Sequence, residues 1–292
     1  MQAPSSRIPR PGDFAALLQL EFDGDEFISQ YGEANLTGNA FGGQLMAQAV
    51  TAAAHGLDSQ RRLRSLHATF LKPLPLDPQL RYQVQSTLQG RSFSNLEVQS
   101  MIGQQVAFRA SLCFQTEEDG PSHQDSAPEV APPDSLLDLA QLADLHQDRL
   151  SDGNRRMLKA RHLHELRPLE GEAFLFCGDR RPSMRYWIRS RDRLSDDPRL
   201  HEAALVYMSD AWINSAMLLP HVATRMSRDF FAPTLTHDLW FHRSFRADEW
   251  LLFDVHSPSL QGATGLVNAA IYDLEGRLIA NATQHALFRR LG

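Results

Sequence analysis

One stretch of the chain decides the fold because a second stretch repeats it. The first, Leu66–Gln115, begins LHATFLKPLPLDPQLRYQVQSTLQGRSF, and the second, Leu239–Arg289, begins LWFHRSFRADEWLLFDVHSPSLQGATG. Both contain a Leu-Gln-Gly turn, which ends at Gly90 in the first copy and at Gly262 in the second. A repeat unit of this length is a whole domain rather than one turn of a solenoid, so the sequence predicts two related modules.

A second turn fixes the alignment of the two copies. The hairpin glycine Gly103 recurs at Gly276, an offset of 173 residues, whereas the Leu-Gln-Gly turn recurs after 172, so one inserted residue explains the difference. Strands are expected on both sides of these turns. The expected strands are Leu63–Leu71, Gln79–Leu88, Ser92–Ile102 and Gln105–Gln115 in the first copy, and Met184–Arg189, Phe230–His237, Asp238–Phe245, Glu249–Ser257, Ala263–Asp273 and Leu278–Arg289 in the second.

A helix-like segment precedes each copy. The string Phe41-Gly42-Gly43-Gln44 opens an alanine-rich run, Leu45–Ala54, and the Gly pair predicts a tight entry loop whose backbone closely approaches another part of the chain. The strongest helix prediction is His201–Leu219, which Pro220 ends. The patterns therefore predict an α+β protein, with a helix and an antiparallel sheet occurring twice.

A change of composition separates the modules. Residues 116–133 read TEEDGPSHQDSAPEVAPP, which is acidic, rich in proline and almost without large apolar side chains. We expect an N-terminal module at 1–116 with a loose tail at 1–13, a linker at 117–155, and a C-terminal module at 156–292. The linker should contain one helix, Leu136–Leu150, capped by Ser135.

The bulk properties exclude several classes of protein. The net charge of -6 gives no electrostatic signature of nucleic-acid binding, and no apolar run is long enough to span a membrane. The N-terminus lacks the apolar core of a secretory signal, and two cysteines are too few for a disulfide framework. We therefore expect a cytoplasmic protein with no nucleic-acid partner and no membrane span.

Asp210 is the first candidate for chemistry. It interrupts the expected helix His201–Leu219, whose residues are otherwise apolar nearly all round and therefore buried. An unpaired carboxylate in such a place costs several kcal/mol, so Asp210 needs dedicated partners or a wet pocket. It could equally hold backbone amides of a neighbouring loop.

Two further polar residues belong to the second copy. Gln284 would share one face of the last strand with Leu278, Ala280, Ala282 and Ala286, and Ser111 stands at its position in the first copy. Its amide must find hydrogen-bond partners there, as any buried Gln would. Thr234 stands where a strand begins, a position that a threonine often takes as a plain strand former.

Ordered motifs across both modules resemble the acyl-CoA thioesterase II family. They are FGGQ (41–44), HATFLKP (67–73), GRSFS (90–94), YMSD (207–210), TLTHDLWFH (234–242), EWLLF (249–253) and the late Gln284. The resemblance implies a double hotdog fold, in which two tandem modules join into one extended sheet, and hydrolysis of an acyl-CoA thioester without metal or cofactor.

The resemblance also implies roles for particular residues. Asp210, Thr234 and Gln284 would together hold the attacking water, with Asp210 as the general base. Substrate contacts are expected at four other positions. These are Gly43, Gln44, His67 and Trp212.

Three positions depart from the family pattern, and two other functions stay open. Thr236 replaces a common Asp, and Leu96 and Glu97 replace an Arg pair.

A binding protein would keep the fold and hold acyl-CoA without cleaving it. A hydratase or dehydratase would need a His paired with an acid, for which His67 is the candidate. A homo-oligomer is the expected assembly, with acyl-CoA as the only other partner.

Overall fold

The computed structural model describes residues 10–35, 37–76, 79–177, 181–224 and 230–290. Of the loose tail expected at 1–13, residues 1–9 lie outside this part of the chain. The chain forms two compact units. One comprises the described residues up to Gly120 with Leu194–Asp210, and the other comprises Pro121–Arg193 with the described residues from Ala211 onward.

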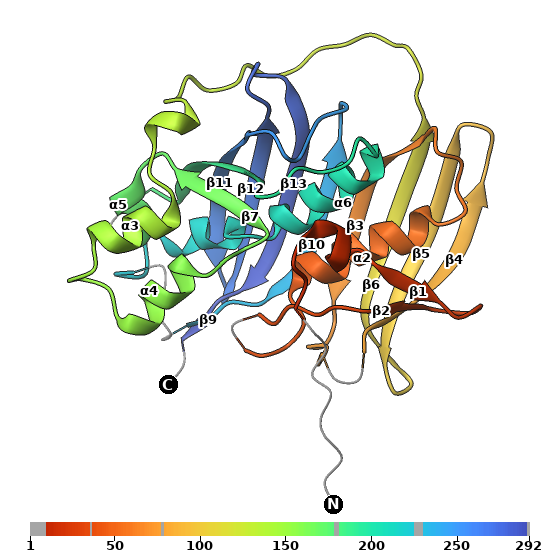
Figure 1. The fold of residues 1–292 in the computed structure, drawn as a ribbon, viewed down its shortest axis with the longest axis horizontal. Coiled ribbons are helices and arrows are strands. Elements are labelled where there is room, and N and C mark those ends of the chain that lie inside the picture. The colour runs from red at the N-terminus through yellow and green to blue at the C-terminus, as the bar shows by residue number, and fades with distance from the viewer. Residues whose placement is uncertain (1–9, 36, 77–78, 178–180, 225–229, 291–292) are drawn as a thin grey trace, which may run out of the picture. The chain divides into compact units, whose positions relative to one another are not determined.

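The first unit contains an antiparallel sheet with the order β1-β2-β4-β5-β6-β3 (Figure 1). Its four long strands match the four predicted in the first copy to within a few residues. The bounds are β1 Leu20–Phe22, β2 Phe27–Ser29, β3 Arg61–Phe70, β4 Arg81–Gln89, β5 Phe93–Ile102 and β6 Gln105–Thr116.

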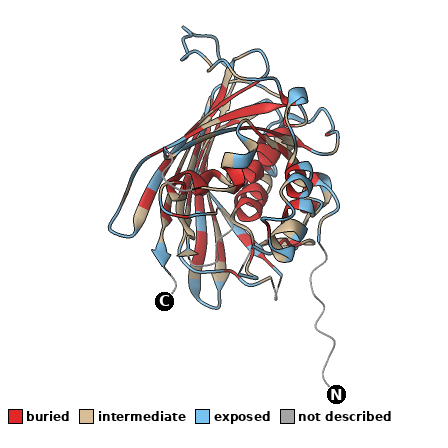
Figure 2. Ribbon diagram, turned by 90° about the vertical axis from the view of Figure 1, so that its left-hand side faces the viewer, coloured by how far each residue is buried: buried red, intermediate tan, exposed pale blue. Residues whose placement is uncertain are grey.

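Helices α2 (Gly42–Ala54) and α6 (Pro198–Ser209) lie side by side in this unit (Figure 1). Helix α2 packs on β4, β5 and β6, and its alanines allow close approach, so nearly all its turns are buried (Figure 2). The short helix α1 (Phe14–Leu17) also contacts α6. Helix α6 thus groups with the first unit, although the sequence placed it in the second module.

Arg199 at the start of α6 ties the two helices together. Its guanidinium donates to the carbonyl oxygens of Ala54, Leu57 and Asp58 at 3.2, 2.9 and 2.5 Å. These carbonyls lie at and just beyond the C-terminal end of α2, where a helix leaves acceptors unsatisfied and a cation is favoured.

The second unit repeats the strand order of the first. Its sheet runs β10-β13-β12-β11-β8-β7, and β11-β12-β13-β10 corresponds to β4-β5-β6-β3, which confirms the internal repeat. The predicted break between Phe230–His237 and Asp238–Phe245 is wrong, because one strand spans Asp238. The bounds are β7 His164–Pro168, β8 Ser183–Ser190, β10 Thr234–Phe241, β11 Leu251–Gln261, β12 Thr264–Tyr272 and β13 Leu278–Leu287, with β9 Phe230–Phe231 pairing with β14 Arg289–Arg290.

The predicted helix His201–Leu219 is two elements. Helix α6 ends at Ser209, Trp212 has a φ of 68°, and a 3₁₀ helix, η2 (Ile213–Leu218), follows. The apolar pattern could not reveal this break, which depends on distant contacts such as the bond from the Tyr186 hydroxyl to the Ala211 carbonyl at 3.2 Å. Because η2 packs on β8, β11, β12 and β13, it occupies in the second unit the place that α2 has in the first.

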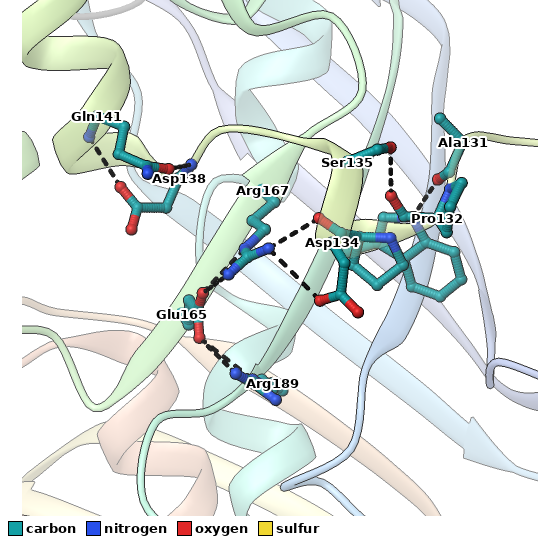
Figure 3. Close-up of polar contacts among 11 residues, drawn as sticks. Ala131, Pro132, Asp134, Ser135, Asp138, Gln141, Glu165, Arg167 and Arg189 are labelled. Atoms are coloured by element: carbon teal, nitrogen blue, oxygen red, sulfur yellow. Dashed lines mark hydrogen bonds and ion pairs between the residues drawn. The ribbon is translucent and has the colours of Figure 1, made fainter.

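The helix expected at Leu136–Leu150 is shorter and has a different cap. Helix α3 spans Leu139–Leu145 and begins at a capping box in which Asp138 and Gln141 bond reciprocally (Figure 3). The Ser135 hydroxyl instead bonds back to the Pro132 carbonyl within a 3₁₀ turn, η1 (Pro133–Ser135). Two further helices, α4 (Asp152–Lys159) and α5 (Gly171–Leu175), were not predicted.

The acidic linker lies on the second sheet. Residues 117–132, all of them described, form neither helix nor strand. The Trp187 indole donates to the Ala131 carbonyl at 3.0 Å, and Arg167, which is also paired with Glu165, donates to the Pro133 carbonyl at 2.9 Å (Figure 3). The linker thereby covers a row of apolar side chains on the sheet. That row is Trp187, Leu252, Tyr272 and Leu278.

Candidate active site

Thr234 and Gln284 meet in the second unit. Thr234 begins β10 opposite Ala286 of β13, and the β10–β13 register shifts between Thr234 and Thr236. The Gln284 amide nitrogen donates to the Thr234 hydroxyl at 2.5 Å. Gln284 is completely buried, on the same strand face as the buried Ala280, Ala282 and Ala286, as the two-residue period of the strand predicted.

Asp210 is not in the middle of a helix, contrary to prediction. It is the C-cap residue of α6, with φ -83° and ψ -12°, and it is half-buried. Its carboxylate lies against the first turn of α2, since a Cβ added at Gly42 would stand 2.7 Å from Asp210 Oδ2. Thr234 and Gln284 thus meet within the second unit. Asp210 and the start of α2 meet within the first.

Two expected substrate-binding residues, Gly43 and Gln44, lie in the first turn of α2. The Gly pair belongs to the helix itself and not to an entry loop. Gln44 is completely buried; its oxygen accepts from the Glu33 amide at 2.6 Å and its nitrogen donates to the Tyr31 carbonyl at 2.9 Å. An influence of Gln44 on substrate binding would therefore act through the 31–33 loop that it holds.

The other two expected contacts differ in their surroundings. Trp212 has the left-handed φ of 68°, a genuine outlier for a bulky residue, and its ring packs on Phe174 with centroids 5.3 Å apart. Such strain is often found at functional sites. His67 is exposed on β3, between the buried Leu66 and Ala68.

Known proteins resemble this chain over both modules. Residues 32–115 match the family model of the acyl-CoA thioesterase N-terminal domain, and residues 130–288 match that of the C-terminal domain. Acyl-coenzyme A thioesterase 8 of Homo sapiens is 31% identical over 259 residues, which cover 85% of this chain and 80% of the human protein. The chain belongs to the acyl-CoA thioesterase family. Its members are thioester hydrolases.

Solved structures identify the fold. The acyl-CoA thioesterase II TesB2 from Mycobacterium marinum has a TM-score of 0.77 and 28% identity, covering 96% of this chain and 99% of that one. A hot dog fold protein from Alicyclobacillus acidocaldarius has a TM-score of 0.75 at 19% identity, covering 96% and 98%. The fold is a double hotdog, as the resemblance implied.

The three departures from the family pattern lie within the sheets. Leu96 is 5% exposed and packs in the core of the first unit, where a charged side chain would need a partner. Glu97 accepts a hydrogen bond from the Ser111 hydroxyl on the neighbouring strand. Thr236 pairs with His285 in the β10–β13 ladder. Leu96 and Glu97 are thus accommodated within the first unit.

His237 is a buried histidine directly opposite Gln284 in the β10–β13 register. Burial lowers the pKa of its imidazole from 6.5 to about 3, so His237 is neutral and cannot supply a proton near neutral pH. His164 on β7 is also fully buried, and desolvation, with the charges of His162 and Arg191, lowers its pKa to about 3.

No helix among the described residues is both long and apolar enough to cross a bilayer.

These two histidines should make the protein sensitive to acid. Between pH 6.5 and 3 each imidazole takes up a proton only when the chain unfolds. The two imidazoles therefore do not lower the free energy of unfolding above pH 6.5, and they lower it increasingly as the pH falls below that value. Each costs about 1.4 kcal/mol per pH unit, so we expect the unfolding free energy to drop by about 4 kcal/mol from pH 7 to pH 5. Urea unfolding at both pH values measures this; His237→Gln should reduce the slope, and the exposed His256→Gln should not. Equal slopes for the two variants would contradict the prediction.

Proposed function

We propose that the protein hydrolyses fatty acyl-CoA to a free fatty acid and CoA, using a water molecule held by Asp210, Thr234 and Gln284. The observation that carries this proposal is the hydrogen bond between the Gln284 amide and the Thr234 hydroxyl. In β6, the corresponding strand of the first unit, the buried positions are occupied by Ala110, Leu112 and Phe114, so the fold itself does not require an amide at this position. An amide buried among small side chains and bonded to a hydroxyl is suited to fixing the orientation of a water.

The hydrogen-bond pattern gives each residue a part. Because the Thr234 oxygen accepts from Gln284, the proton of its hydroxyl points away from the amide, toward another acceptor. In the proposal that acceptor is the water oxygen. Asp210 accepts a proton from the same water, which turns a remaining lone pair toward the thioester carbonyl.

The reaction then proceeds by addition and elimination. The water oxygen bonds to the carbonyl carbon while Asp210 takes one proton, and the carbonyl oxygen becomes an oxyanion. When the intermediate collapses, the carbon–sulfur bond breaks, the CoA thiolate leaves, and the proton held by Asp210 returns to it. General-base catalysis of this kind contributes roughly 10²–10⁴-fold, and orientation contributes more.

The proposal needs neither a metal nor a cofactor, because a thioester has a good leaving group and the base is a side chain. We place the reaction in the cytoplasm and expect a homo-oligomer, since most protein oligomers are assemblies of identical chains.

Thr234 offers a matched pair of variants that tests the proposal. Thr234→Val keeps the shape and removes the hydroxyl, whereas Thr234→Ser keeps the hydroxyl. We expect kcat for CoA release from acyl-CoAs of short to long chain to fall about 10–100-fold in the Val variant, because the water loses one of its anchors. The Ser variant should stay within about threefold of the wild type.

Two outcomes would count against the proposal. Equal activity of the Val and Ser variants would remove Thr234 from the mechanism. No CoA release at any chain length, while acyl-CoA still raises the melting temperature, would instead favour a protein that binds acyl-CoA without cleaving it.

A further inference from the structure

The start of helix α2 is shaped around Asp210. A Cβ built at Gly42 would lie 2.7 Å from Asp210 Oδ2 and 3.2 Å from the ring of Phe70. Real Cβ contacts are essentially never as short as the first of these. Any side chain at position 42 would therefore displace the carboxylate, and only a hydrogen atom leaves it in place.

The neighbouring glycine has a different reason to be there. A Cβ at Gly43 would lie 2.5 Å from the backbone carbonyl oxygen of Tyr207 and 2.5 Å from the ring of Phe41. A backbone atom can move aside only at a large cost in free energy, so Gly43 is required for α2 and α6 to pack. The obstacle at Gly42 is mainly the far end of a side chain, which can rotate, so the fold can tolerate a methyl group there.

A hydrogen-bond network fixes how α2 approaches Asp210. The Tyr207 hydroxyl, one turn before Asp210 on α6, donates to Glu33 Oε2 at 2.5 Å. The main chain of Glu33 bonds to the start of α2, accepting from the Phe41 amide at 2.9 Å and donating to Gln44 Oε1 at 2.6 Å. The end of α6 and the start of α2 are thus both held by one buried acidic residue, which is 8% exposed.

The N-terminus of α2 is favourable for a carboxylate. Phe41, the N-cap residue, makes no side-chain capping bond, so its side chain satisfies none of the first amides of this 13-residue helix. The positive end of the helix dipole lies at the same place and stabilises a negative charge. The missing side chain at Gly42 allows Asp210 to reach this position.

We infer that Gly42 is a positioning residue that sets the place of the Asp210 carboxylate over the first turn of α2. The inference rests on the proposed function, in which Asp210 is the base. It extends the machinery to a residue that has no side chain and acts through Asp210. A displacement of about 1 Å at a catalytic group can cost about 10²-fold in rate, so a single methyl group is sufficient to reveal the effect.

Gly42→Ala tests the inference, with Gly153→Ala as its matched control. Gly153 also lies in the first turn of a helix, but the nearest atom to its Cβ would be 4.0 Å away. We expect Gly42→Ala to lower kcat about 10–100-fold with KM changed less than about threefold, and Gly153→Ala to leave both unchanged. A crystal structure of Gly42→Ala should show Asp210 rotated while the rest of α2 keeps its place.

The double variant with Asp210→Asn distinguishes positioning from a general loss of structure. If Gly42 acts through the carboxylate, Gly42→Ala should change the residual activity of Asp210→Asn by less than about twofold, because the group it displaces is already inactive. The same fold-loss in both backgrounds, or an unmoved Asp210 in the crystal structure, would overturn the inference. Full activity of Asp210→Asn would instead overturn the proposed mechanism, and with it any catalytic role for Gly42.

Discussion

Asp210→Asn should lower kcat for CoA release by 100-fold or more. The variant keeps the size of the side chain and its ability to accept hydrogen bonds, but an amide cannot take the proton of the attacking water. General-base catalysis alone accounts for roughly 10²–10⁴-fold, which sets the expected loss. KM should change little, because the carboxylate contributes to the transition state more than to substrate binding.

The measurement is a panel of acyl-CoAs from short to long chains, with wild type and variant side by side. Asp144→Asn is the control, since it removes the same charge from an exposed position where Asp144 pairs only with Lys159 among the described residues. An Asp210→Asn variant that keeps more than about a fifth of the wild-type kcat on every substrate would show that Asp210 is not the base. Asp210 would then have only a structural role, such as holding backbone amides of a neighbouring loop.

The repeated turns predicted most of the architecture. Gly90 and Gly262 end matching turns, and the sheets on either side of them have the same strand order. Local turn chemistry and alternation determine such strands, so the sequence alone was sufficient to predict the four long strands of the first copy to within a few residues. The break after Ser209 was missed because the run around it, apart from Ser209, Asp210, Asn214 and Ser215, is apolar nearly all round. Such a pattern indicates burial without indicating where a helix ends.

The candidate site also has features that the sequence predicted and features that it could not predict. The face of Gln284 followed from the two-residue period of a strand, and its bond to Thr234 joins neighbouring strands. The surroundings of Asp210 could not be predicted, because they depend on how α2 packs against α6. A sequence can show that a Gly pair allows close approach, but only the fold shows that the atom approaching Gly42 is Asp210 Oδ2. Glu33, a single acid in a loop, gave no signal at all.

A buried ion pair between β3 and α6 carries the largest expected effect on stability. Arg62 donates through Nε and a terminal nitrogen to Glu202 Oε1, both at 2.8 Å, and Glu202 is 3% exposed. Burial raises the pKa of Glu202 more than the charge and hydrogen bonds of Arg62 lower it. Desolvation therefore outweighs the attraction, as is common for buried pairs.

Removing only Arg62 should be far more harmful than removing the pair. Arg62→Met leaves a buried carboxylate without its partner, and we expect a loss of about 3–5 kcal/mol in the free energy of unfolding by urea. Arg62→Met with Glu202→Leu should restore most of that loss, because neither charge remains to be desolvated. A double variant as unstable as Arg62→Met would show that the pair itself holds α6 on the sheet.

The pH dependence of the single variant provides an independent check. A carboxyl group whose folded pKa is raised contributes stability below its unfolded pKa, and that contribution is lost as the pH rises through the folded pKa. Without Arg62 to lower it, the pKa of Glu202 should rise further. The deficit of Arg62→Met relative to wild type should therefore be smaller at pH 5 than at pH 8, whereas the double variant should show no such difference. A deficit that stays constant across this range would mean that Arg62 stabilises the helix by packing and not through the charge of Glu202.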